Sequence, residues 1–114
     1  MTAFRTLLAA IFIFILTYTI VVAWNHGFGL LPIFFGDIAN MTWPGQFNLD
    51  FLFFLILSAL WLAWRHNFSP VGLALGLLGL LGGSLFLSAY LFIASFSANG
   101  NIKPLFLGKA RARD

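Results

Sequence analysis

Three ionisable side chains in the first half of the chain are the strongest candidates for chemistry: His26, Asp37 and Asp50. Imidazole and carboxylate groups of this kind can bind a metal ion or relay a proton. Their spacing matches no known ligand signature, and a structural role for each is the simpler interpretation. We therefore predict no catalytic residue, no metal site and no cofactor.

The composition restricts the possible chemistry further. The chain contains no Cys, which excludes disulfides, thiolate metal sites and Cys nucleophiles. Only 8% of its residues are charged and 61% are hydrophobic, with a mean hydropathy of +0.99. Soluble domains contain about 25% charged residues, so this composition is typical of a membrane protein.

The net charge of +3 comes largely from one end of the chain. Three of the six Lys and Arg residues lie within the last six positions, at Lys109, Arg111 and Arg113. A nucleic-acid-binding protein would carry a basic face on its folded surface. We therefore expect membrane lipids as partners and no nucleic acid.

Three apolar stretches must position the candidate residues. Residues 6–24, 49–64 and 70–96 are each apolar and long enough to suggest a membrane span. The sequence therefore predicts an all-α membrane protein in which residues 1–114 form a single domain with three transmembrane helices. The first stretch has one alternative interpretation, a signal peptide with Arg5 as its basic region.

The connector of residues 25–48 is rich in Gly and Pro, which argues against one long helix. Its apolar part is too short to span, and predicts a short interfacial or re-entrant helix between the first and second spans. Asn48 is placed to cap the second span, with Asp50 in the first turn, where a carboxylate complements the helix dipole. Residues 97–114 form a basic tail.

Four glycines in the third stretch follow a spacing of four, three and four: Gly72, Gly76, Gly79 and Gly83. This spacing lines them along one side of a helix, where backbones can approach closely. In lipid such small residues mark a helix-packing interface. The partner is either another helix of this chain or another protein.

Polar residues of all three spans gather in the membrane half next to the connector: Tyr18, Asp50, Ser84, Ser88 and Tyr90. His26 and Asp37 of the connector lie just above them. These seven residues predict a ligand or ion pocket covered by the connector. The alternative is ordinary interfacial polarity, with hydroxyl groups bonded within their own helices.

Three spans place the N-terminus and the turn between the second and third spans on one face of the membrane, and the connector and the C-terminus on the other. The basic residues then give conflicting orientation signals, because Arg5 and Arg65 lie on one face and the basic tail on the other. The first helix usually dominates orientation, so we expect the N-terminus inside.

The stretches PIFFGDIANMTWPGQFNLDFLFFLILSALWLAWRH and GLLGGSLFLSAYLF resemble small bacterial integral membrane proteins with domains of unknown function. The shared pattern is a first span, an apolar connector, an Asp that opens the second span and a third span containing Gly. The resemblance implies a bacterial inner membrane and supplies no catalytic residues. Its most distinctive part is the TWPGQFNLD segment.

These observations favour a non-enzymatic accessory or assembly subunit that packs through the glycine stripe against a larger membrane complex, or against a second copy in a homo-oligomer. One alternative is an oligomeric channel or transporter for small ions or protons. Another is a binder of a lipid-like ligand in the polar pocket.

Overall fold

The computed structural model describes residues 1–112, so Arg113 of the basic tail lies outside the described residues. The described part of the chain is helical and contains no strand. The helices are α1 (Thr2–His26), α2 (Leu30–Ala39), α3 (Trp43–Arg65), α4 (Pro70–Ser97), α5 (Ile102–Leu107) and α6 (Lys109–Ala112).

Three of these helices, α1, α3 and α4, are long and apolar enough to cross a membrane, and the shorter apolar α2 lies between the first and second of them. This confirms the predicted all-α class, with three long apolar helices and a shorter one between the first and second. The composition and these three helices together indicate a membrane protein.

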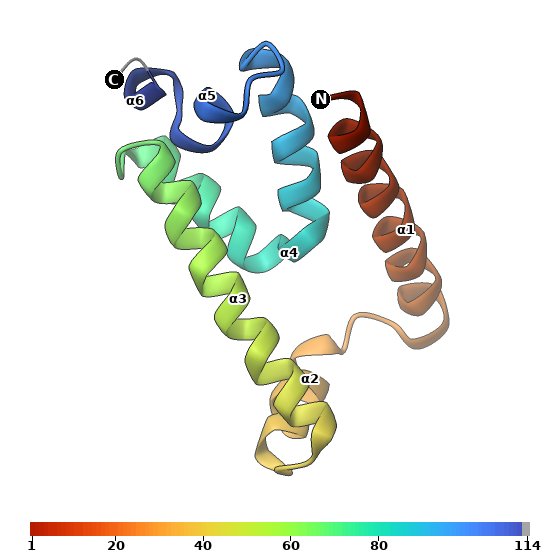
Figure 1. Ribbon diagram of the computed structural model, residues 1–114. Helices are drawn as coiled ribbons and strands as arrows, with labels where there is room; N and C mark the ends of the chain where they lie inside the picture. The colour runs from red at the N-terminus through yellow and green to blue at the C-terminus, as the bar shows by residue number, and fades with distance from the viewer. Residues whose placement is uncertain (113–114) are drawn as a thin grey trace.

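The helix α4 reverses direction near its middle. Gly83 has φ 57° and ψ −137°, a backbone conformation that is not helical and that only glycine adopts readily. Figure 1 shows α4 running away from the α3–α4 turn and then returning to the end of the molecule from which it started. We call residues 70–82 and 84–97 its first and second halves.

The reversal defines two ends of the molecule. The terminal end holds the start of α1, the α3–α4 turn, α5 and α6, and the connector end holds residues 27–42 (Figure 1). Two hydrogen bonds from Arg5 to Ser95, at 2.8 and 3.0 Å, fix the end of α4 beside the start of α1. The prediction that residues 70–96 carry the tail to the connector side was therefore wrong, because the backbone turns back at Gly83.

The two halves of α4 pack between α1 and α3, and the glycines of the first half face α3. Gly72, Gly76 and Gly79 are buried. A Cβ atom on Gly76 would lie 2.9 Å from the carbonyl oxygen of Ala59, and one on Gly79 would lie 2.5 Å from Cδ1 of Leu62. The absence of these Cβ atoms therefore allows α3 and α4 to approach closely.

The second long helix begins earlier than the sequence suggested. α3 starts at Trp43, with Pro44 in its first turn, where its missing N–H costs no hydrogen bond. Gly45 is buried directly against the backbone of Asp37 and Ile38, which lets α2 pack on α3. Pro44 and Gly45 thus begin a helix instead of interrupting one.

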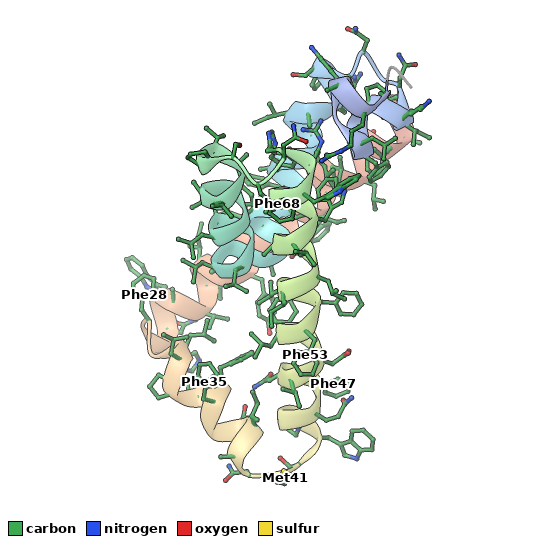
Figure 2. The ribbon with its side chains drawn as sticks, turned by 90° about the vertical axis from the view of Figure 1, so that its left-hand side faces the viewer. Phe28, Phe35, Met41, Phe47, Phe53 and Phe68 are labelled. Carbon is green, nitrogen blue, oxygen red and sulfur yellow. The ribbon has the colours of Figure 1, made fainter. Side chains whose placement is uncertain are left out.

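Asn48 joins α2 to α3. The prediction that it caps the second span was wrong. Its side-chain amide donates to the carbonyl oxygen of Phe34 at 3.1 Å. The TWPGQFNLD segment therefore forms the α3 side of a helical hairpin, with α2 on the other side (Figure 2).

Candidate functional site

The predicted pocket residues do not converge on one site. His26 and Tyr18 are exposed on α1, Tyr18 to 71%. Asp37 is half-buried between α2 and α3, where the amide of Asn48 lies 3.5 Å from its carboxylate. The connector therefore packs on α3 and does not cover a pocket shared with the third span.

Two third-span members of the predicted pocket, Ser88 and Tyr90, lie on the half of α4 that returns to the terminal end. Tyr90 bonds to residues of the terminal end, and Ser88 is buried and donates its hydroxyl to the carbonyl oxygen of Leu85 at 3.2 Å. Ser84 is exposed directly after the Gly83 reversal. The expected place of Ser88 and Tyr90 beside the connector was wrong, because α4 turns back at Gly83 and carries both residues toward the terminal end.

Asp50 lies deeper in its helix than predicted. Because α3 begins at Trp43, Asp50 belongs to the third turn, and no acidic residue occupies the first turn. Its side chain is exposed and makes no hydrogen bond or ion pair within residues 1–112. The interpretation that it complements the helix dipole at the N-terminus therefore does not apply.

A polar cluster at the terminal end joins α3, the α3–α4 turn and α4. Arg65 donates from Nη1 to the hydroxyl of Tyr90 at 2.8 Å, and that hydroxyl lies 2.5 Å from Nε2 of His66. Because the Tyr90 hydroxyl accepts from Arg65, its single hydrogen is available for His66 Nε2. This assigns the proton of neutral His66 to Nδ1.

The surroundings of His66 in this cluster lower the pKa of its imidazole. Burial lowers the pKa of His66, and the positive charge of Arg65 lowers it further. His66 is therefore neutral at pH 7.

Arg65 also fastens the C-terminal segment to the end of α3. Its Nε donates to the carbonyl oxygen of Leu105 at 2.7 Å and its Nη2 to that of Pro104 at 3.2 Å. The indole N–H of Trp61 donates to the carbonyl oxygen of Phe106 at 3.1 Å. The side chains of one helix thus satisfy successive carbonyl groups of α5, and α5 lies over the terminal end.

Arg111 forms the next attachment along the tail. Its Nη1 donates to the carbonyl oxygen of Trp64 at 2.6 Å, and its guanidinium carbon lies 4.0 Å from the centre of the Trp64 ring. Arg111 thus holds the basic tail against α3, whereas the sequence indicated only a contribution to the net charge. Its acceptor is a backbone carbonyl group, which has no sequence signature.

Charge is separated between the two ends of the molecule. The described Lys and Arg residues all belong to the terminal end: Arg5, Arg65, Lys103, Lys109 and Arg111. The two described carboxylates, Asp37 and Asp50, lie on α2 and in the connector half of α3. The terminal end is therefore strongly basic.

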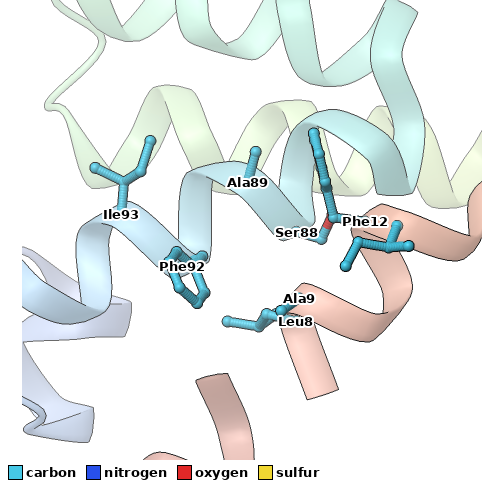
Figure 3. A pocket seen from close by; sticks show the side chains of 8 residues that line it. Leu8, Ala9, Phe12, Ser88, Ala89, Phe92 and Ile93 are labelled. Atoms are coloured by element: carbon cyan, nitrogen blue, oxygen red, sulfur yellow. The ribbon is translucent and has the colours of Figure 1, made fainter. Parts of the chain in front are cut away.

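A groove of about 270 Å³ runs between α1 and the second half of α4 (Figure 3). Its walls are apolar side chains, among them Leu8, Phe12 and Phe92, and the buried Ser88 is the one polar residue that lines it. Because the Ser88 hydroxyl is already bonded within its helix, the groove suits hydrocarbon and not an ion.

Within residues 1–112, no three His, Asp or Glu side chains are grouped so that they could hold a metal ion. Comparison with family models, with curated proteins and with solved structures found no match to this chain. The features of the described residues that bear on function are the exposed Asp50, the basic terminal end and the apolar groove.

Proposed function

We propose that the chain is a non-enzymatic membrane protein that assembles with another membrane protein, or with a second copy of itself, through the side of α3 that carries Asp50. The observation that carries this proposal is the exposed, unpartnered carboxylate of Asp50. An ionisable group inside a membrane span is costly unless it faces protein or water.

The depth of Asp50 supports this proposal. Fifteen residues separate Asp50 from Arg65, which corresponds to about 22 Å along the helix axis. With Arg65 at one interface, Asp50 lies inside a hydrocarbon core of about 30 Å. A partner that offers a hydrogen-bond donor here would remove the cost of exposing the carboxylate to lipid.

The proposed contact face is defined by Asp50, Phe54 and Leu57, which lie at i, i+4 and i+7 on one side of α3. Phe54 is 66% exposed and Leu57 is 63% exposed. This face replaces the glycine stripe of our initial hypothesis, because α3 already covers Gly72, Gly76 and Gly79.

Cross-linking tests this face directly, because the chain has no native Cys. We expect Leu57→Cys to form a cross-linked product in native membranes, either with a second copy or with another membrane protein. Ile56→Cys is the matched control, since Ile56 is also exposed, at nearly the same depth, but lies about 100° around the helix. Equal cross-linking at both positions would count against a specific face.

Particle mass in mild detergent provides the second test. We expect a complex clearly larger than one 12.6 kDa chain, and dissociation of that complex in Asp50→Ala. Asp37→Ala is the control, because Asp37 is occupied between α2 and α3. A wild-type monomer, or a complex that Asp50→Ala leaves intact, would overturn the proposal.

The same residue suggests a second candidate, in which several copies surround Asp50 and conduct small ions or protons. That candidate requires flux in liposomes containing the purified protein, and loss of flux in Asp50→Asn. Assembly without flux would favour the accessory function.

The charge separation supports an orientation. Basic residues favour the cytoplasmic side, so we propose that the terminal end faces the cytoplasm, with residues 1 and 112 on the same side. The resemblance implies that the membrane is a bacterial inner membrane. This orientation agrees with our expectation for the N-terminus and removes the conflict, because the bent α4 returns the basic tail to the side of Arg5.

Labelling of single-Cys variants tests the orientation. A membrane-impermeant maleimide should label Met41→Cys, at the connector end, in intact cells. It should label Asn99→Cys only after the cells are permeabilised. The reverse pattern would refute the orientation, and labelling of both positions in intact cells would refute the shared side of the termini.

A further inference from the structure

A cavity of about 310 Å³ lies at the terminal end between the α3–α4 turn and the α5–α6 segment. Its polar lining is basic or neutral and consists of Arg65, His66, Asn67, Lys109 and Arg111. No carboxylate of residues 1–112 lines it. We propose that this cavity binds a phosphate-type anion, a function separate from assembly through Asp50.

Arg111 is held in place beside the cavity, Lys109 is mobile, and both keep donors for a ligand. Arg111 uses Nη1 for the carbonyl oxygen of Trp64 and stacks on the Trp64 ring, which fixes its guanidinium. Its Nε and Nη2 have no partner among residues 1–112. Lys109 is exposed beside it and brings a mobile ammonium group to the same cavity.

The α3–α4 turn supplies neutral donors on the opposite wall. The hydroxyl of Tyr90 occupies Nε2 of His66, which leaves the Nδ1–H of His66 as a donor. Asn67 holds its backbone in the left-handed region, with φ 59°, and it also lines the cavity, so that its amide is a further neutral donor. An anion is therefore offered both charged and neutral donors.

A phosphate group fits this donor set better than a single carboxylate does. It carries more negative charge and several acceptor oxygens, and guanidinium and ammonium groups are its usual partners in proteins. Arg65 adds positive charge although most of its own donors are bonded to Tyr90, Leu105 and Pro104. The bound phosphate comes either from a lipid headgroup or from solution, since the cavity lies at an end of the membrane helices.

The two histidines allow a direct test by NMR. His66 lines the cavity, whereas His26 lies at the end of α1 toward the connector and serves as an internal reference. The full chain with ¹⁵N-labelled histidine is titrated with sodium phosphate in a maltoside detergent free of phospholipid, against sodium chloride at equal ionic strength. We expect a saturable shift of the His66 resonances and none at His26.

A second arm identifies the source of the phosphate. The chain is placed in nanodiscs of phosphatidylglycerol and in nanodiscs of phosphatidylcholine. A His66 shift in phosphatidylglycerol alone, with no response to inorganic phosphate, assigns the site to an anionic lipid headgroup. A response to inorganic phosphate assigns it to a dissolved anion, and the absence of a His66 response in both arms overturns the proposal.

A matched pair of variants separates a specific site from general positive charge. Lys109→Gln removes a cation that lines the cavity, and Lys103→Gln removes an equal charge from α5 at the same end. We expect Lys109→Gln to weaken binding about tenfold, the usual effect of losing one charge-assisted hydrogen bond, and Lys103→Gln to leave it nearly unchanged. Equal weakening by both variants, or shifts of both histidines, would also overturn the site.

Discussion

Arg5 on α1 donates two hydrogen bonds to Ser95 near the end of α4, one to its hydroxyl at 2.8 Å and one to its carbonyl oxygen at 3.0 Å. The guanidinium carbon also lies 3.8 Å from the centre of the Phe96 ring. Ninety positions along the chain separate these partners. The pair therefore connects the first helix to the returning half of α4.

This pair predicts a moderate loss of stability in Ser95→Ala. The variant keeps the carbonyl acceptor but removes the hydroxyl, and we expect a loss of about 1 kcal/mol in the free energy of unfolding. The measurement is unfolding by a denaturing detergent in mixed micelles. Ser97→Ala is the control, because Ser97 is exposed, and an equal loss in the control would contradict the assigned role.

Gly83→Ala tests the reversal of α4. The backbone of Gly83 lies in a region that other residues rarely adopt, and an added Cβ would lie 3.2 Å from Cζ of Phe51. We expect destabilisation by about 1–3 kcal/mol, measured as thermal unfolding in detergent.

The control for Gly83 is Gly36→Ala, since a Cβ at Gly36 in α2 would meet no atom within 4 Å. That change should stabilise the protein slightly, because Ala has the higher helix propensity. A Gly83→Ala protein as stable as the wild type would show that the reversal does not depend on glycine.

Gly76→Ala tests the contact between α3 and the first half of α4. The new Cβ would lie 2.9 Å from the backbone oxygen of Ala59, which cannot move without displacing α3. We expect a cost of about 1–3 kcal/mol, as for other overpacked interfaces, in the same detergent unfolding assay. Ala74→Leu, on an exposed position of α4, should have little effect.

The lowered pKa of His66 predicts that stability falls in acid. The unfolded chain takes up a proton near the ordinary value of 6.5, whereas the folded protein takes it up only at a lower pH. Stability is therefore fully present above pH 6.5 and decreases as the pH falls from there to the folded pKa. The groups around His66 are Arg65, Tyr90, Lys109 and Arg111.

Thermal unfolding between pH 5 and pH 8 measures this dependence, and His66→Gln should reduce it. His26→Gln is the control, because His26 is exposed at the other end of the molecule. An equal pH dependence in wild type and His66→Gln would assign the effect to other groups.

Apolar length alone predicted the three long helices and the short α2, because a hydrocarbon core imposes a minimum length on any span. The bend in α4 could not be predicted, since Gly83 fits the four, three, four spacing as well as it fits a reversal. Close helix packing and a non-helical backbone both depend on the missing Cβ of glycine. The error at Gly83 then moved Tyr90, Ser88 and the tail to the wrong end.

The polar cluster at the terminal end could not be predicted for a different reason. The sequence shows Arg65 only as a basic residue directly after the second span, whereas its acceptors include the carbonyl oxygens of Pro104 and Leu105. Any residue offers such an oxygen, so the sequence carries no sign of the contact. Asn48 was misassigned for a related reason, because an amide suits both a helix cap and the backbone of a neighbouring helix.

The reversal of α4 also bears on how the protein would be inserted into a membrane. If the terminal end lies on the side of synthesis, only the connector end has to be carried across the bilayer. Asp37 is the one charged residue in residues 25–48. In the proposed orientation, residues 66–112 would enter the membrane and leave it again on the side where they were translated. The insertion machinery would then transfer one short, almost uncharged loop, and the described Lys and Arg residues would stay on the side of synthesis.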